Sequence, residues 1–105
     1  MKKFLILYRS TVSATEQMKG ATPEQAKAGM DAWMTWAKKT SAALVDLGAP
    51  LGESTLLQGT AAPGFVRGYS IVQAESLDSA RKLFDGHPHF RAPGNSIELL
   101  ELLPM

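Results

Sequence analysis

The stretch FVRGYSIVQAESLDSARKLFDG, residues Phe65–Gly86, predicts a strand that is followed at once by a helix. Its first part, Phe65–Ala74, is rich in β-branched and aromatic side chains, which favour a strand. Ser76 is a favourable N-cap for the helix, and Gly86 is of a residue type that commonly ends one. Between these two, apolar residues recur at helical spacing: Leu77, Ala80, Leu83 and Phe84.

A second, longer helix is predicted over Thr22–Gly48. Thr22 and Gln25 form a capping-box pattern, and the proline after Thr22 suits the first helical position. Gly48 is the predicted end of the helix, because glycine readily adopts the left-handed conformation in which many helices terminate. One face of this helix carries an apolar stripe: Ala26, Met30, Trp33, Ala37, Leu44 and Leu47.

Three further segments have the composition of strands: Phe4–Arg9, Leu51–Gly59 and Ser96–Pro104. The polar segment Ser10–Ala21 has no usable period, and we expect a long loop there that could cover a binding cleft. The order of elements is βαββαβ, in a single domain over residues 1–105. It predicts an α+β, ferredoxin-like fold, a four-stranded antiparallel sheet with two helices on one face.

The predicted sheet is apolar on both of its faces. In the first strand, Leu5 and Leu7 lie on one face. The other face of the same strand carries a second apolar and aromatic set: Phe4, Ile6 and Tyr8. The two helices cover only one face, and a monomer rarely leaves a second face this apolar in water. We therefore expect a homodimer in which the second faces of two copies pack together.

Composition narrows the possible partners. The chain has 105 residues and a formal net charge of +1, so no strong field attracts nucleic acid or anionic lipid. It has no cysteine, which excludes disulfides and thiolate metal sites. The apolar run in MKKFLILYRS is too short for a signal sequence, and no stretch reaches the length of a membrane span. We expect a cytoplasmic protein with no membrane and no nucleic-acid partner.

RNA binding is the competing interpretation of RGYSIVQA, residues Arg67–Ala74, which is close to the signature of the RNA-recognition motif. That motif stacks bases on three exposed aromatic side chains. Only Tyr69 is aromatic here, and the near-zero net charge gives no electrostatic support. The residues therefore favour another kind of ligand.

Four segments carry a resemblance to a known family: WMTW at Trp33–Trp36, GYSIVQAESLDSARKL at Gly68–Leu83, HPHF at His87–Phe90 and SIELLELLP at Ser96–Pro104. Together they look like the YCII-related domain family. The resemblance implies a small dimeric α+β barrel built from the βαββαβ order. It also implies that any enzymatic role would use a histidine on the first helix and an aspartate in an Asp-Pro dipeptide after the second.

This chain departs from the family pattern at both positions. His87-Pro88 stands where the family has Asp-Pro, and no histidine lies upstream of His87. Asp31 lies on the predicted long helix, about a turn before the place of the missing histidine. The two partners could thus be exchanged, with Asp31 orienting the imidazole of His87.

Both histidines of the chain, His87 and His89, lie in one short segment around Pro88. A tetrahedral metal site would need a third ligand, and the sequence offers no further histidine or cysteine but only carboxylates such as Asp85, Glu98 and Glu101. We therefore expect no metal site and no cofactor. An acid–base role would need a cleft and an orienting carboxylate, for which Asp31 is the candidate. The simpler alternative is a helix exit, in which the charge of His87 complements the helix C-terminal dipole.

Five other side chains are candidates for ligand contacts: Tyr8, Trp36, Arg67, Tyr69 and Arg91. Tyrosine hydroxyls could donate hydrogen bonds, arginines could anchor a carboxylate, and Trp36 could line a pocket. The first functional hypothesis is a homodimeric module with a cleft for a small aromatic or apolar ligand and no assigned reaction. The alternative is a cofactor-independent isomerase, lyase or dehydrochlorinase that acts on a small cyclic or aromatic acid by histidine acid–base chemistry.

Overall fold

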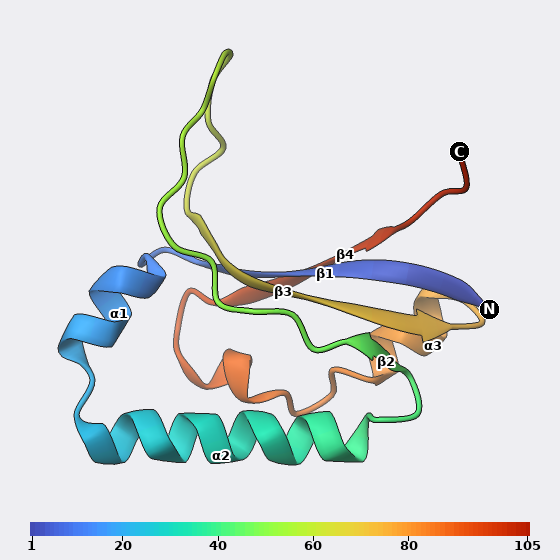
Figure 1. Ribbon diagram of the computed structural model, residues 1–105, viewed down its shortest axis with the longest axis horizontal. Helices are drawn as coiled ribbons and strands as arrows, with labels where there is room; N and C mark the ends of the chain where they lie inside the picture. The colour runs from blue at the N-terminus through green and yellow to red at the C-terminus, as the bar shows by residue number, and fades with distance from the viewer.

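One antiparallel sheet organises the chain in a computed structural model that describes residues 1–105 (Figure 1). The sheet order is β2-β3-β1-β4, with β1 at Lys2–Ser10, β2 at Leu44–Asp46, β3 at Phe65–Ala74 and β4 at Ser96–Glu101. The central strand β1 pairs antiparallel with both β3 and β4. This order confirms the α+β, ferredoxin-like class predicted from the sequence.

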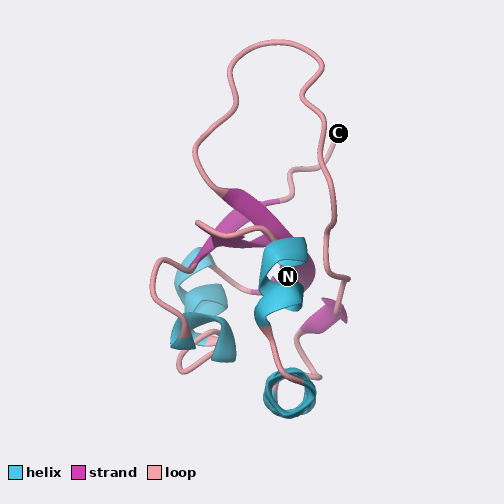
Figure 2. Cartoon of the chain, turned by 90° about the vertical axis from the view of Figure 1, so that its left-hand side faces the viewer, coloured by secondary structure: helices cyan, strands magenta, loops and turns pink.

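The helices are α1 at Ala14–Gly20, α2 at Pro23–Lys39 and α3 at Leu77–Lys82, and a short 3-10 helix, η1, spans Pro88–Arg91. α2 and α3 lie on one side of the sheet, and α1 lies at one end of it (Figures 1 and 2). The capping box of α2 is confirmed, because Thr22 and Gln25 exchange two hydrogen bonds of 3.0 and 3.1 Å. None of the helices has the length and apolar character that crossing a membrane requires.

The predicted end of the long helix is wrong, because α2 ends at Lys39 and not at Gly48. After a turn the chain enters β2, where Leu44 pairs with Val72 of β3. Pairing with a strand distant in sequence satisfies the backbone groups that a longer helix would have used. Leu44 and Leu47 still pack against the core, but they do so from β2 and the segment after it.

Gly48 does adopt the left-handed conformation that was expected of it, with φ at +81°, although no helix ends there. It lies instead in the segment that follows β2. A Cβ at this position would lie 1.7 Å from the carbonyl oxygen of Tyr69, so the backbone passes too close to β3 for any other residue. Close approach to the sheet, and not helix termination, accounts for this glycine.

Two further predictions are corrected. The segment Leu51–Gly59 is not a strand but part of an exposed loop, and the second strand of the sheet is β2, which lies upstream of it. The segment Ser10–Ala21 is not only loop, because it contains α1. Ser13 caps α1 by accepting a hydrogen bond of 3.2 Å from the backbone N–H of Glu16. α1 has no buried residue, which explains why no apolar period marks it in the sequence.

The core lies between the sheet and the helices. It consists of nine buried residues: Phe4, Ile6, Tyr8, Trp36, Ala37, Val72, Ala74, Ala80 and Phe84. Trp36, which lies outside the predicted stripe, is more deeply buried than Trp33, which lies within it. The first two turns of α2 add no buried side chain, so Ala26 and Met30 of the stripe are exposed. The helix therefore meets the sheet through its second half.

The opposite side of the sheet is apolar and only partly covered. Leu5 of β1 lies across from Ile71 of β3 and Leu100 of β4, and Leu7 lies across from Tyr69. None of these five side chains is fully buried, and Leu100 is 38% exposed. We call these five residues the bare face.

Candidate functional site

The segment that contains both histidines folds as a capped turn and not as a metal clip. His87 is the N-cap of η1, and Pro88 occupies the first position of that helix. The Nδ1 atom of His87 accepts a hydrogen bond of 3.0 Å from the backbone N–H of His89. Both imidazoles are buried, at 1% and 6% exposure, so each ring is turned into the protein. In the whole chain, no group of three or more histidines and carboxylates is placed to hold a metal ion.

Four aromatic rings surround the imidazole of His87. Tyr8 of β1 stacks on it at 5.2 Å between ring centroids, with an interplanar angle of 25°. Trp33 and Trp36 of α2 meet it in edge-to-face geometry at 4.6 and 4.5 Å, and Phe84 lies at 5.7 Å. We call His87 with these four residues the aromatic cage. Its members come from β1, from α2 and from the segment between α3 and η1, so the cage joins the main elements of the fold.

Burial keeps His87 neutral. It lowers the pKa of this imidazole to about 4, and a charge on the neighbouring His89 would lower the pKa further. Because Nδ1 uses its lone pair to accept the His89 N–H, the proton of the neutral ring is on Nε2. This Nε2 atom is buried and has no hydrogen-bond partner. The ring of His87 is therefore neutral and held in place by the hydrogen bond at Nδ1, while its Nε2–H has no hydrogen-bond acceptor and is surrounded by the faces and edges of aromatic rings.

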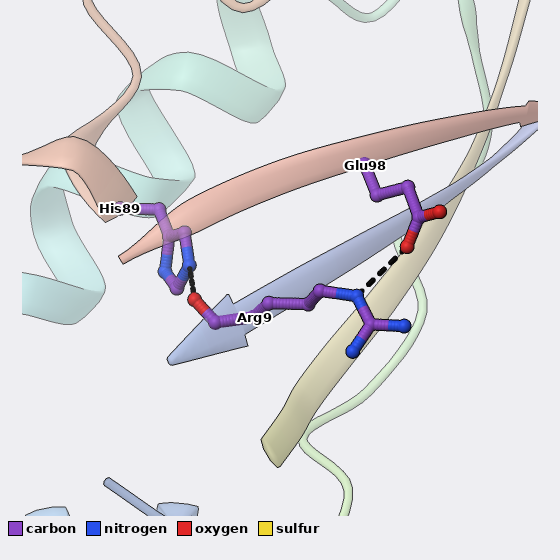
Figure 3. A network of polar contacts seen from close by, with 3 residues as sticks. All are labelled: Arg9, His89 and Glu98. Carbon is purple, nitrogen blue, oxygen red and sulfur yellow. Dashed lines mark hydrogen bonds and ion pairs between the residues drawn. The ribbon is translucent and has the colours of Figure 1, made fainter. Parts of the chain in front are cut away.

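His89 is committed to the sheet (Figure 3). Its Nε2–H donates a hydrogen bond of 2.8 Å to the backbone carbonyl of Arg9, at the end of β1. The side chain of Arg9 in turn pairs with Glu98 of β4, with 2.7 Å between Nε and Oε1. Burial lowers the pKa of His89, and the hydrogen bond to the Arg9 carbonyl opposes that effect. The side chain of the second histidine thus fastens η1 to the end of β1, and the Arg9–Glu98 pair joins β1 to β4 there.

The hydroxyl of Tyr8 is also occupied by a hydrogen bond within the protein. Ser70 donates a hydrogen bond of 2.7 Å to the backbone carbonyl of Leu47, so its oxygen accepts the Tyr8 O–H at 2.9 Å. Burial raises the pKa of Tyr8 to about 12, against a smaller opposing effect of the Ser70 hydrogen bond. Tyr8 therefore acts as a neutral wall of the cage, with no free hydroxyl proton.

The structure does not bring the remaining candidates to the cage. Asp31 is exposed on α2, and its carboxylate lies 3.3 Å from the Nζ atom of Lys27. Arg67 of β3 donates a hydrogen bond to Gln17 of α1. Tyr69 belongs to the bare face, on the side of the sheet away from the helices. The residue that holds His87 in orientation is thus its neighbour in η1, and no carboxylate does so.

Two of the candidates do meet, in a hollow of about 290 Å³ between α2 and the segment from Asp85 to Arg91. Trp36 and Arg91 both line it, together with two residues of α2 that the sequence reasoning missed, Thr35 and Lys39. The hollow is completed by Ala32, Asp85, Gly86 and Pro88. Lys39 follows Trp36 by one helical turn, which is the signal that would have placed it on the same face.

The charges around this hollow are unpaired. Lys39, Arg91 and Asp85 make no salt bridge in the structure, so the hollow has two free cations and one free carboxylate on its walls. Trp36 forms the boundary between the hollow and the cage, because it lines the first and contacts His87 in the second. Its Nε1–H donates to the carbonyl of Leu83 at 2.8 Å, which holds the indole in place. The site therefore offers two cations and one carboxylate around a hollow whose wall includes a small part of the fixed Trp36 ring.

No family model matches the chain, and none of the curated proteins matches it. Membership of the YCII-related family accordingly stays a prediction. Among solved structures, the chain is similar to 5-chloro-2-hydroxyhydroquinone dehydrochlorinase from Burkholderia phenoliruptrix, in complex with 2,5-dihydroxybenzoquinone. The two share 22% identity over 91% of this chain and 90% of that one, with a TM-score of 0.50. This likeness shows the fold.

Replacing His87 tests its neutral, buried state. Between pH 6.5 and about 4, His87 takes up a proton in the unfolded chain but stays neutral in the folded protein. The free energy of unfolding of the wild type therefore falls as the pH falls through this range. This residue alone accounts for a loss on the order of 3 kcal/mol. His87→Asn keeps a side-chain acceptor for the turn but has nothing to titrate.

We expect His87→Asn to be less stable than wild type at pH 8, because the cage loses a ring. The difference in free energy of unfolding between the two proteins, here called the gap, should become smaller as the pH falls. Urea unfolding at pH 8, 5.5 and 4.5, at one protein concentration, measures this gap. His89→Asn serves as the comparison for the second histidine. A gap that does not change with pH would contradict the neutral state of His87.

Proposed function

We propose that this protein is a homodimer that binds a small, planar, negatively charged ring compound in the hollow between α2 and the segment from Asp85 to Arg91. The observation that carries the proposal is the pair of unpaired cations, Lys39 and Arg91, which outnumber the one carboxylate, Asp85, on the walls of the hollow. An acidic group of the ligand can meet these cations, while its ring fits into a hollow whose wall includes the small exposed part of Trp36. The hydroxyl of Thr35 offers one further hydrogen bond.

The size of the hollow limits the ligand. Its volume of about 290 Å³ lies just below the range of roughly 300–1,000 Å³ for small-molecule sites, which favours a single ring. A larger hollow of about 470 Å³ lies along α2, but its walls are Met34, Thr35, Ala37 and Lys38, with no aromatic ring. The smaller hollow therefore fits the expected chemistry better.

The ligand in the similar solved structure agrees with this class of compound. 2,5-Dihydroxybenzoquinone is a single planar ring, and it is a vinylogous acid that carries negative charge at neutral pH. Its negative charge is what the pair Lys39 and Arg91 would recognise, and its single ring suits the small volume of the hollow. This likeness of chemistry supports a small hydroxylated or carboxylated ring as the ligand and makes that quinone a practical probe.

Arg91 can be tested with this probe. We expect Arg91→Ala to weaken the binding of 2,5-dihydroxybenzoquinone about tenfold, because one partly solvated charge contact is worth on the order of 1 kcal/mol. Isothermal titration calorimetry at low ionic strength measures the affinity. Arg81→Ala is the matched control, since Arg81 lies on α3 and pairs with Asp78 there. Equal affinities of the two variants, or no binding by wild type, would remove the hollow as the site.

A cofactor-independent enzyme of the dehydrochlorinase type is the second candidate. The observation that favours it is the unpartnered Nε2–H of His87, which is separated from the hollow by Trp36. With its Nδ1 occupied and its ring neutral, His87 would serve as a hydrogen-bond donor to a substrate and not as a base, and the N–H of His89 would orient it in place of Asp31. Chloride release from a chlorinated hydroxyhydroquinone, lost in His87→Asn, would support this activity. Turnover that His87→Asn leaves unchanged would contradict it.

The homodimer is supported by the amount of surface that one protomer exposes. Its accessible area is 7616 Å², whereas a compact monomer of 11.3 kDa should expose about 5,700 Å². Its radius of gyration is 14.4 Å, against about 12.9 Å expected for 105 residues. The excess area, about 1,900 Å², exceeds the roughly 800 Å² that each partner of a standard interface buries. The bare face is the apolar surface that a second copy would cover, as in a dimeric α+β barrel.

Leu100 tests this interface. We expect Leu100→Arg to convert a dimer to a monomer at micromolar concentration, because two charges would be buried opposite an apolar sheet. Leu77→Arg is the control, since Leu77 is more exposed, at 50% against 38%, but lies on α3. Sedimentation equilibrium reports the mass of each variant. A wild-type monomer at all concentrations, or a Leu100→Arg dimer, would contradict sheet-to-sheet pairing.

A further inference from the structure

The loop between β2 and β3 extends away from the rest of the protomer. We call its residues Leu51–Gly64 the arm. The arm contains neither helix nor strand, and every residue after Leu51 is exposed. Figures 1 and 2 show it rising from the sheet on the side opposite to α2. Unstructured loops of this length are uncommon in small domains and commonly have a function.

The base of the arm is held firmly. The backbone N–H of Leu51 donates a hydrogen bond of 2.8 Å to the carbonyl of Arg67, and Pro50 forms a bridge with Gly68 of β3. At the other end Gly64 has φ of +84°, and a Cβ there would lie 3.0 Å from the carbonyl oxygen of Ser10. Both ends are thus fixed on the sheet, and the sheet sets the direction in which the arm leaves.

The tip of the arm is apolar. Leu56 is 56% exposed and Leu57 is 94% exposed. Glu53 is the only charged residue in the sequence of the arm, LGESTLLQGTAAPG. Two adjacent solvated leucines, with almost no charge near them, are typical of a segment that packs on another surface. The protomer itself offers them no cover.

We infer that the arm of each protomer packs against the body of a second copy of this chain, with Leu56 and Leu57 buried there. The inference rests on the homodimer proposed above. The arm and the bare face lie on the same side of the sheet. Half of a 14-residue loop can extend up to about 23 Å, whereas packed sheets lie about 10 Å apart. In a face-to-face dimer the arm must therefore pass the partner's sheet.

The surface excess also points to a second copy. Covering the five side chains of the bare face leaves the arm and its leucines outside the interface between the sheets. An excess of about 1,900 Å² is larger than a standard interface requires from one partner. Exchange of two arms would bury the additional area. In a dimer with two-fold symmetry, the same exchange would bury the tips of both arms in equivalent positions.

The double variant Leu56→Ser/Leu57→Ser tests the arm. We expect its dimer dissociation constant to rise at least 100-fold in sedimentation equilibrium, because four leucines per dimer lose their apolar contacts. Leu77→Ser, a comparably exposed leucine on α3, is the control and should leave the constant unchanged. An unchanged constant in the double variant would overturn the inference. If Leu100→Arg still abolished the dimer in that case, the homodimer itself would stand.

A second measurement follows the tip directly. The chain has no cysteine, so Gln58→Cys labels one site with a polarity-sensitive dye beside both leucines. We expect the emission to shift to the blue as the protein is concentrated into the dimer, and not in the Leu100→Arg background. A blue-shifted emission at every concentration would mean that the arm folds on its own chain. A wild-type protein that stays monomeric would overturn the arm together with the homodimer.

Discussion

The burial of one imidazole among four aromatic rings is the interaction on which the arrangement of this protein depends. His87 touches Tyr8 of β1, both tryptophans of α2, and Phe84 in the turn after α3. The buried imidazole stays neutral, because a charge among these rings would lose its hydration without gaining a counter-ion. The same ring caps η1 through Nδ1. One side chain thus joins the helical layer, the central strand and the turn that leads to β4.

This structural role changes what the histidines can do chemically. Each neutral ring has one nitrogen whose state is set by a backbone partner: Nδ1 of His87 accepts an N–H, and Nε2 of His89 donates to a carbonyl. Neither imidazole is poised as an oriented base beside a carboxylate. The groups that could bind a ligand lie outside the cage, in the hollow on the other side of Trp36, where positively charged side chains are unpaired. The arrangement suits binding of a small anionic compound and leaves the Nε2–H of His87 as a buried hydrogen-bond donor without a partner.

The opposite face of the sheet follows a different constraint. The protomer is far from spherical, with extents of 39 × 38 × 20 Å, and its helices cover only one face of the sheet. A molecule of this shape exposes more surface than a sphere of equal mass, and here the additional surface includes five partly open apolar side chains and an arm with leucines at its tip. Both features face the same way. Sheet-to-sheet pairing with exchanged arms would cover both at once.

Local chemistry in the sequence determined much of the fold. β3 spans Phe65–Ala74 as its β-branched composition predicted, and Ser76 and Thr22 cap α3 and α2 as expected. The two apolar faces of the sheet could also be predicted from the sequence, because the alternation of side chains along a strand depends only on neighbouring residues. These features share one property, which is that the residues that decide them lie close together in the chain.

Tertiary structure decided the rest. Leu44 continues the helical stripe of the sequence, yet it pairs with Val72, and that partner is far away along the chain. Asp31 seemed the natural companion of His87, but it faces solvent with Lys27, while Trp33 and Trp36 turn inward. The neutral state of His87 and the meeting of Lys39 with Arg91 likewise depend on which segments pack together. Burial and strand pairing are set by contacts between distant residues, and no local pattern records them.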